Sequence, residues 1–500
     1  MTCRVTQRLG YIADLGVDAI WHSPFFTSPM VDMGYDVADH RDVDLTFGTL
    51  ADFDALVAKA HYLGLRVIID QVLSHSSDHH PFFTESRAAR SNPRADWYLW
   101  RDAKPDGSPP NNWQSVFGGP GWEWDVRRRQ FYYHSFLEEQ PDFDFNNPQV
   151  QEWALQTLGF WLDRGADGFR LDAINFCAQD IALRDNPPVD AEAYQTAIKT
   201  FDMQRTIYSK NQPAALSFSE KMRALVDCHG EHVLIGEIGE AHHPAELLVD
   251  YTKGDQRLHT AYNTALMGDV LTPAHVKAAI EAIVIPGGAP TWAFSSHDDR
   301  RHVSRWAAYG ADHSSLARLT CALLLCLPGA ICLYQGEELG LTQTELDYDE
   351  LIDPEGKTFW PDNPGRDGCR TPMPWERNAP HAGFSNADKT WLPMKAPQAN
   401  RAADTQIDDP DSTLGFYRNM LTLRRQQPDL RHAPIAFEDA PEHILRFRRG
   451  EMICTFNLSA DQSATLTQAV AGPVLLSQNT DITDSGLTLG PSGFIIQTVQ

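Results

Sequence analysis

The chain has 500 residues, of which 42% are hydrophobic and 22% are charged, and its formal net charge is −25. This composition supplies enough apolar residues for a sizeable core and excludes a disordered protein. The acidic excess argues against a general nucleic-acid binder and against docking on anionic lipid. It leaves a neutral or cationic small molecule open as the partner.

The sequence shows no clear membrane span, targeting signal or cysteine pairing. The longest apolar run, 321–334, is interrupted by Pro328, and about 20 residues are needed to cross a bilayer. The N-terminal stretch MTCRVTQRLGYIADLG has no apolar signal core. The eight cysteines are scattered without a CxxC pair, which argues against a zinc site or a disulfide framework. We therefore expect a cytoplasmic protein.

Short apolar runs alternate with amphipathic helices over the first 330 residues. Helical periodicity predicts helices over 51–63 and 150–162, each with one apolar face. The apolar runs predict strands at 17–21, 65–69, 168–171, 233–236, 292–294 and 330–334. Short buried strands separated by helices imply a parallel sheet with crossover connections. Over this length, the best prediction is an α/β protein with a closed (β/α)₈ TIM barrel.

Two segments depart from this alternation. Residues 76–141 are rich in Pro, Gly, Trp and charge, and so long an irregular stretch inside a domain is rarely passive. After a predicted helix over 412–426, short strands separated by turn residues predict a C-terminal antiparallel β-sandwich. The predicted domains are a first barrel segment over 1–75, a small B domain over 76–141 inserted after the third strand, a second barrel segment over 142–428 and the β-sandwich over 429–500.

Acidic residues follow four of the predicted strands, as Asp70, Asp172, Glu237 and Asp298. In a parallel barrel, functional groups lie just past the carboxyl ends of the strands. A single acid there is more often a turn or helix cap. Four together are harder to explain, because crowded carboxylates raise one another's pKa. The pattern favours acid/base chemistry, and glycosidic bond cleavage requires two carboxylates with separate roles.

Arg170 stands two residues before Asp172, so the two side chains of this strand share a direction. A neighbouring guanidinium would help to keep Asp172 ionised, as a nucleophile must be. Asp298 would help to keep Glu237 protonated, as an acid catalyst must be. Arg170 could instead simply neutralise a nearby acid.

Eight motifs, in order along nearly the whole chain, resemble segments of glycoside hydrolase family 13, the α-amylase family, in its α-glucosidase and oligo-1,6-glucosidase branch. Four look like the family's barrel motifs: DQVLSH (70–75), GFRLDA (168–173), LIGEI (234–238) and SSHDD (295–299). Two look like its flanking motifs, QPDFD (140–144) and LPGAICLYQGEELGL (327–341). Two are similar to segments typical of the branch, DMGYD (32–36) and CRTPMPW (369–375).

The resemblance implies a catalytic set and a retaining, double-displacement mechanism. Asp172 matches the nucleophile, Glu237 the general acid/base and Asp298 the third acid, which holds sugar hydroxyls. Arg170 would position Asp172. Water as the second acceptor gives hydrolysis, whereas another alcohol gives transglucosylation, and the sequence leaves the ratio open.

The resemblance also implies a pocket that is blind at one end, so that the enzyme acts on terminal glucose. Two histidines would bind glucose hydroxyls, and an Asp–Arg pair would grip the far hydroxyl. A tyrosine would stack on the sugar and two phenylalanines would line the entrance, although core packing is an equal alternative for the phenylalanines. The two histidines are His75 and His297, and the Asp–Arg pair is Asp32 with Arg370. The tyrosine is Tyr35, and the phenylalanines are Phe117 and Phe136.

Ala173 bears on linkage. In the branch that the sequence resembles, Val directly after the nucleophile accompanies α-1,6 activity and a smaller residue accompanies α-1,4 activity. Ala173 therefore favours maltose over isomaltose. Together with the blind pocket, the resemblance implies an exo-acting α-glucosidase for maltose and short malto-oligosaccharides, with transglucosylation and sucrose as further options. The expected partner is this small-molecule substrate, with no nucleic acid or membrane, and the oligomeric state is open.

The N-terminus departs from the family pattern. Family members begin with a strand and an acidic metal-binding loop, whereas this chain starts within the helix that precedes VDAIW. We therefore expect the first barrel strand to be missing. We also expect the structural Ca²⁺ or Mg²⁺ site typical of the family to be lost with it, and no cofactor.

Three other functions remain open. A sucrose-using transferase or isomerase of the same family, such as amylosucrase or trehalulose synthase, would release fructose or sucrose isomers. A non-catalytic relative that acts as a scaffold or transporter partner would lack the catalytic acids and carry a membrane anchor. The third is an inactive, truncated form.

Overall fold

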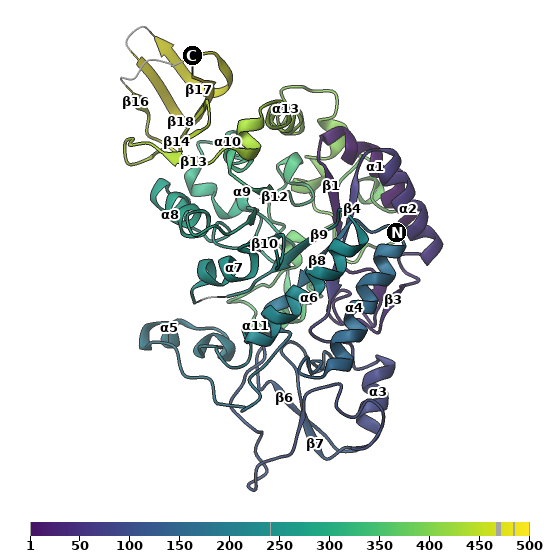
Figure 1. The fold of residues 1–500 in the computed structure, drawn as a ribbon. Helices are drawn as coiled ribbons and strands as arrows, with labels where there is room; N and C mark the ends of the chain where they lie inside the picture. The colour runs from purple at the N-terminus through teal and green to yellow at the C-terminus, as the bar shows by residue number, and fades with distance from the viewer. Residues whose placement is uncertain (1, 241, 467–471, 484–485, 500) are drawn as a thin grey trace. The chain divides into compact units, whose positions relative to one another are not determined.

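The computed structural model describes residues 2–240, 242–466, 472–483 and 486–499 (Figure 1). The chain divides into two compact units. One contains Met1–Ala13, Val17–Tyr262 and Asp353–Asn363, and the other contains Asp14–Gly16, Asn263–Ile352 and Pro364–Gln500. The predicted B domain therefore falls within the first unit and the predicted β-sandwich within the second, while the domain boundaries themselves stay predictions.

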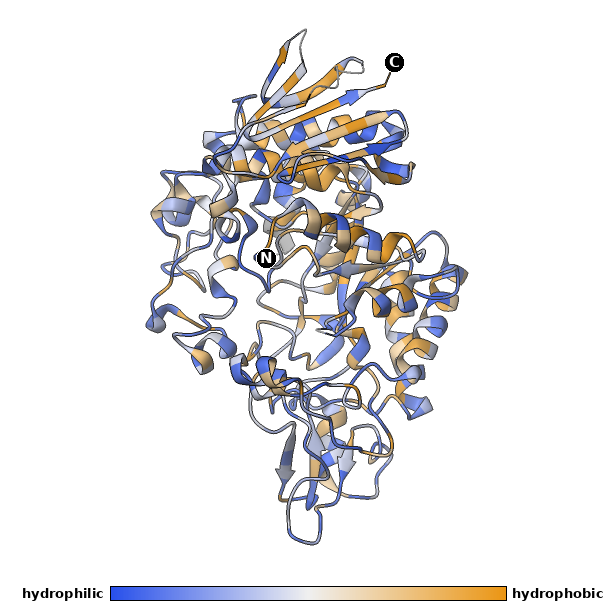
Figure 2. Ribbon diagram, turned by 90° about the vertical axis from the view of Figure 1, so that its left-hand side faces the viewer, coloured by the Kyte–Doolittle hydropathy of each residue, from blue (hydrophilic) through white to orange (hydrophobic). Residues whose placement is uncertain are grey.

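Parallel strands form the sheet of the first unit. Their order in the sheet follows the chain: β1 (Ala19–His22), β4 (Arg66–Val72), β8 (Gly168–Asp172), β9 (Val233–Glu237) and β10 (Thr260–Asn263). The helices that separate them in the chain are α2 (Leu50–Tyr62), α4 (Pro148–Asp163), α6 (Pro213–His229) and α7 (Pro244–Thr252), and α1 (Thr2–Leu15) precedes β1. The helices carry both hydrophobic and hydrophilic residues (Figure 2), as expected for amphipathic helices that cover a sheet.

The segment inserted between β4 and α4 has a small core of its own. Helix α3 (Pro81–Ala88) is followed by an antiparallel sheet in the order β5 (Trp100–Arg101), β7 (Gln130–Tyr133) and β6 (Trp122–Asp125). One buried cluster combines Leu99, Trp113, Trp122, Phe131 and Tyr133. The aromatic residues that mark this segment in the sequence therefore serve packing.

The second unit combines helices with a pair of parallel strands and an antiparallel sheet. β11 (Pro290–Trp292) pairs in parallel with β12 (Ala330–Ile331). The principal helices are α8 (Pro273–Val284), α10 (His313–Cys326) and α13 (Thr413–Gln426). The C-terminal strands form one antiparallel sheet: β13 (Ile435–Phe437), β14 (Ile444–Arg449), β15 (Met452–Asn457), β16 (Ala464–Leu466), β17 (Val474–Thr483) and β18 (Gly486–Thr498). This confirms the expected C-terminal antiparallel β domain.

Some predicted elements differ from the observed ones. β10, with the sequence TAYN, was not predicted because it lacks a distinct apolar run. β11 begins and ends two residues before the predicted 292–294, and β12 stops at Ile331 although apolar residues continue to Tyr334. Within the described stretches of the chain, no helix is both long and apolar enough to cross a membrane.

Candidate active site

Arg170 lies at the centre of a cluster of carboxylates at the carboxyl ends of β4, β8 and β9. Its Nη1 donates to Asp70 Oδ1 and Oδ2, at 2.9 and 3.1 Å, and to Asp172 Oδ1 at 2.5 Å. Its Nη2 lies 2.7 Å from Glu237 Oε1. Burial alone would lower the pKa of Arg170, but these carboxylates outweigh burial and raise it well above the usual value. One buried cation therefore organises three acids.

Strand geometry explains this convergence. Asp70 is the cross-strand partner of Arg170, and Val72 that of Asp172. Because alternate residues of a strand point the same way, Asp172 faces the same side as Arg170, as predicted. The side chains of Asp172 and Glu237 are 10% and 21% exposed, respectively. Neither side chain is therefore fully buried.

Asp70 is the member of the cluster to which the sequence assigned no role. It is fully buried, and its Oδ2 accepts from Tyr35 Oη at 3.0 Å and from Trp21 Nε1 at 3.3 Å. Burial raises its pKa, against the lowering effect of Arg170. Tyr35, predicted to stack on the sugar, is thus anchored by its hydroxyl. The positions of Asp70 and Arg170 on adjacent parallel strands were the signal that could have predicted their contact.

Ala173 connects the end of β8 to Glu237. Its backbone N–H donates to Glu237 Oε2 at 2.9 Å. Its φ of 40° and ψ of 43° place it in the left-handed region, which is uncommon for a residue with a Cβ and costs of order 1–3 kcal/mol. Ala173 is therefore tied through its backbone to the predicted acid/base.

A second polar cluster in the first unit consists of Asp32 and His75, with Gln140 between them. Gln140 Nε2 lies 3.1 Å from Asp32 Oδ2 and 3.2 Å from His75 Nε2, and His75 Nε2 is also 3.1 Å from the Tyr35 carbonyl. Burial lowers the pKa of His75 to about 4, which keeps its ring neutral at pH 7. Gln140, in the QPDFD motif, is a member of this group that the sequence pattern does not predict.

The two predicted entrance phenylalanines extend this group. The ring of Phe136 lies 5.1 Å from that of His75 and 6.0 Å from that of Phe117. Phe117 is only 8% exposed, so it also serves packing. Phe136 also contacts Phe176, at 5.3 Å between ring centroids.

The remaining predicted residues belong to the second unit and lie together. Asp298 is 34% exposed, and its Oδ1 accepts from Arg370 Nη2 at 2.7 Å. His297 Nε2 is 3.2 Å from Asp298 Oδ2, and Arg370 Nε donates to the His297 carbonyl at 2.6 Å. Asp298 is thus a partner of Arg370, and the resemblance also pairs Arg370 with Asp32, a residue of the first unit. That predicted pair stays a prediction.

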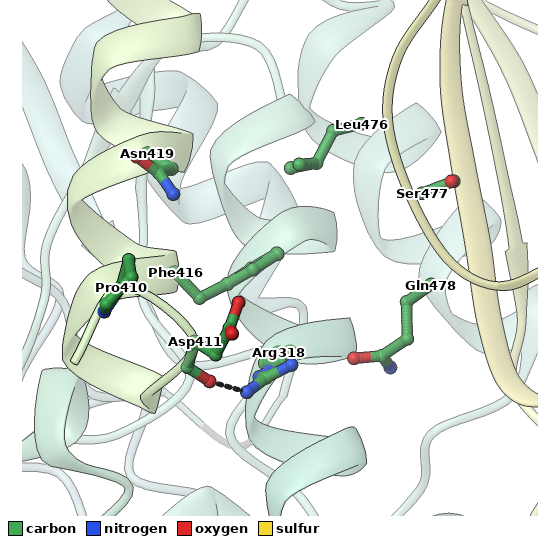
Figure 3. Close-up of a pocket in the computed structure, with 8 residues that line it drawn as sticks. All are labelled: Arg318, Pro410, Asp411, Phe416, Asn419, Leu476, Ser477 and Gln478. Carbon is green, nitrogen blue, oxygen red and sulfur yellow. Dashed lines mark hydrogen bonds between the residues drawn. The ribbon is translucent and has the colours of Figure 1, made fainter.

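A pocket of about 260 Å³ lies elsewhere in the second unit, between α10, α13 and β17 (Figure 3). Arg318, Phe416 and Gln478 are among its lining residues, and none of the predicted site residues is. Among the described side chains, no group of three or more His, Cys, Asp or Glu could hold a metal ion.

Comparisons with known sequences point to one family. The model of the alpha amylase catalytic domain matches residues 4–433. The chain is 49% identical over 472 residues to a probable alpha-glucosidase of Rhizobium meliloti (strain 1021), covering 92% of this chain and 85% of that protein. It is 30% identical over 457 residues to an oligo-1,6-glucosidase of Heyndrickxia coagulans, covering 84% and 80%.

Solved structures agree. The alpha-glucosyl transfer enzyme XgtA superimposes with a TM-score of 0.94 at 45% identity, covering 100% of this chain and 95% of that one. A mutant of the trehalulose synthase MutB, in complex with the substrate sucrose, gives a TM-score of 0.88 at 29% identity, covering 99% and 94%. The chain therefore belongs to the α-amylase family, glycoside hydrolase family 13, and has the TIM-barrel fold of that family.

Proposed function

We propose that this family 13 enzyme is a retaining, exo-acting α-glucosidase that removes terminal glucose from maltose and short malto-oligosaccharides. The observation that carries the proposal is the cluster in which Arg170 holds Asp172 and Glu237 while both remain partly exposed. The 49% identity to a probable alpha-glucosidase supports the same substrate class.

In this proposal Asp172 attacks the anomeric carbon and forms a covalent glucosyl intermediate. Glu237 protonates the departing glycosidic oxygen and then takes a proton from the water that hydrolyses the intermediate. The Arg170 Nη1 contact to Asp172 Oδ1, at 2.5 Å, supports the ionised and oriented nucleophile. Asp298 would bind sugar hydroxyls. The reaction needs only side chains and water, so we propose no cofactor.

The resemblance to the family assigns sugar-binding roles to residues in each of the two polar groups described above. Asp32 and His75 would bind hydroxyls in the first unit, and their link through Gln140 would fix their orientation. His297 and Arg370 would do the same in the second unit. Phe117 and Phe136 would form the apolar entrance.

Transfer of glucose to an alcohol other than water is a second candidate activity. XgtA, at 45% identity, is named an alpha-glucosyl transfer enzyme, and MutB was solved with its substrate sucrose. Both relatives favour tests with sucrose and with alcohol acceptors alongside maltose.

The experiment that tests the proposal measures glucose released from maltose, isomaltose and sucrose by the purified chain, with Asp172→Asn as the control. We expect maltose to be cleaved faster than isomaltose, because Ala173 leaves room beside the nucleophile. The Asp172→Asn variant should lose at least about 10³-fold in rate, since it lacks the nucleophile. Folded wild-type protein without activity on maltose would refute the proposal, and fructose released faster than glucose from sucrose would favour the transferase.

A further inference from the structure

The turn that follows Glu237 is held by two donors on one carbonyl. Lys210 Nζ donates to the Gly239 oxygen at 2.8 Å, and Asn175 Nδ2 donates to the same oxygen at 2.9 Å. Asn175 lies in the single turn η1 (Ile174–Phe176), just after the predicted nucleophile, and Lys210 lies just before α6. Two distant stretches of the loop between β8 and α6 therefore meet at the backbone next to the predicted acid/base.

Lys210 is an unusual choice for that position. It is only 3% exposed, and its ammonium lies 4.9 Å from the ring centroid of Phe176 and 5.6 Å from that of Phe201. Burial lowers its pKa, and Glu240, 3.7 Å away, counteracts this effect. Burying a cation is costly, and Asn175 already satisfies the Gly239 carbonyl. The need for a hydrogen bond to this carbonyl therefore does not by itself explain why a lysine is buried at position 210.

Further hydrogen bonds connect Glu237 and Glu240 to the loop between β8 and α6. Asn175 Nδ2 also donates to Asn211 Oδ1 at 2.8 Å, and Asn211 Nδ2 donates to the Glu240 carboxylate. Glu237 itself accepts from the Ala173 N–H. The acid/base is thus fixed at its carboxylate by one end of the loop and at the following backbone by both ends.

We propose that Lys210, together with Asn175, is a positioning residue that fixes the orientation of Glu237 through the Gly239 carbonyl. Lys210 acts on the backbone and does not touch the substrate. The inference rests on the proposed function, because it requires Glu237 to be the general acid.

The test compares two substrates with the variant Lys210→Met, which keeps the length of the side chain and removes the ammonium. Maltose needs a proton on its leaving oxygen, whereas fluoride leaves α-glucosyl fluoride with little acid assistance. We expect kcat/KM for maltose to fall about tenfold or more and that for α-glucosyl fluoride to fall less than about threefold. The ratio of the two does not depend on how much of the variant is folded.

Lys199→Met is the matched control. Lys199 belongs to the same loop and also pairs with a carboxylate, Glu355, and with an aromatic ring, Phe359 at 5.9 Å. The Lys199→Met variant should leave the ratio of kcat/KM for maltose to kcat/KM for α-glucosyl fluoride unchanged. Equal losses of Lys210→Met on both substrates would overturn the role of Lys210 and leave the proposed function intact. Wild-type protein that cleaves neither substrate would overturn the proposed function and this role with it.

Discussion

His80 caps a helix with a side chain that can also be protonated. It is the N-cap of α3, and its Nδ1 accepts from the Phe82 N–H at 3.1 Å. Burial, and then the charge of Arg94, lower its pKa from 6.5 to about 3. Below pH 6.5, His80 becomes protonated in the unfolded chain but stays neutral in the folded protein. The contribution of His80 to the free energy of unfolding therefore falls as the pH falls from 6.5 towards 3.

The variant His80→Asn keeps a capping oxygen but cannot titrate. Between pH 7.5 and 5.5, wild-type protein should lose about 1.4 kcal/mol more unfolding free energy than His80→Asn. Urea unfolding at the two pH values measures this difference. His79→Asn serves as the control, since His79 is the adjacent histidine and is exposed. Parallel losses in wild type and His80→Asn would contradict the prediction.

Individual residues of the site differ in how well the sequence predicts them. The alternation of side chains along one strand was enough to predict that Arg170 and Asp172 point the same way, and the structure shows the two in contact. The Ala173 contact with Glu237 depends on a positive φ, which no pattern of residue types reveals for an alanine. Contacts set by strand period are therefore predictable, whereas contacts set by an unusual backbone conformation are not.

At the scale of elements, β8 and β9 carry Asp172 and Glu237 side by side. Gly168 permits their pairing, because a Cβ there would lie 2.3 Å from the Val233 carbonyl oxygen and 2.9 Å from its nitrogen. Backbone atoms of a paired strand cannot yield without shifting the strand. We expect Gly168→Ala to destabilise the protein by about 1–3 kcal/mol and to lower kcat more than thermal stability alone would explain.

Gly159→Ala is the matched control for that substitution. Gly159 lies inside α4, and a Cβ there would have no atom within 4 Å. Alanine should stabilise this helix by about 0.5–1 kcal/mol. Differential scanning calorimetry and maltose kinetics on both variants give the comparison. A stable, fully active Gly168→Ala variant would show that β8 and β9 can separate without moving the two acids.

Elements were predicted best where one face or both faces of a strand are apolar over several residues. β4 is buried from Val67 onward and β8 throughout, and the buried face of α4 is apolar except for Thr157, so all three were located within three residues. β10 was not predicted, because the composition of its four residues does not mark them as a strand. They form a strand by pairing with β9, which is distant in sequence. The inserted segment was recognised by composition, but its three-stranded sheet was not.

At the scale of the whole molecule, the net charge of −25 should influence charged ligands but not the proposed substrate. The Debye length falls from about 10 Å at 0.1 M salt to about 3 Å at 1 M, and buried ion pairs such as Arg170 with Asp70 are screened much less than exposed ones. Maltose is neutral and is not steered by the protein's field. We therefore expect kcat/KM for maltose to change less than about twofold between about 0.05 and 0.5 M NaCl.

A cationic iminosugar inhibitor should bind several-fold more weakly at the higher salt, because the acidic protein no longer attracts it as strongly. Inhibition and hydrolysis measured on the same samples separate the two effects. A loss of maltose activity as steep as the loss of iminosugar affinity would mean that salt acts on the carboxylate cluster itself.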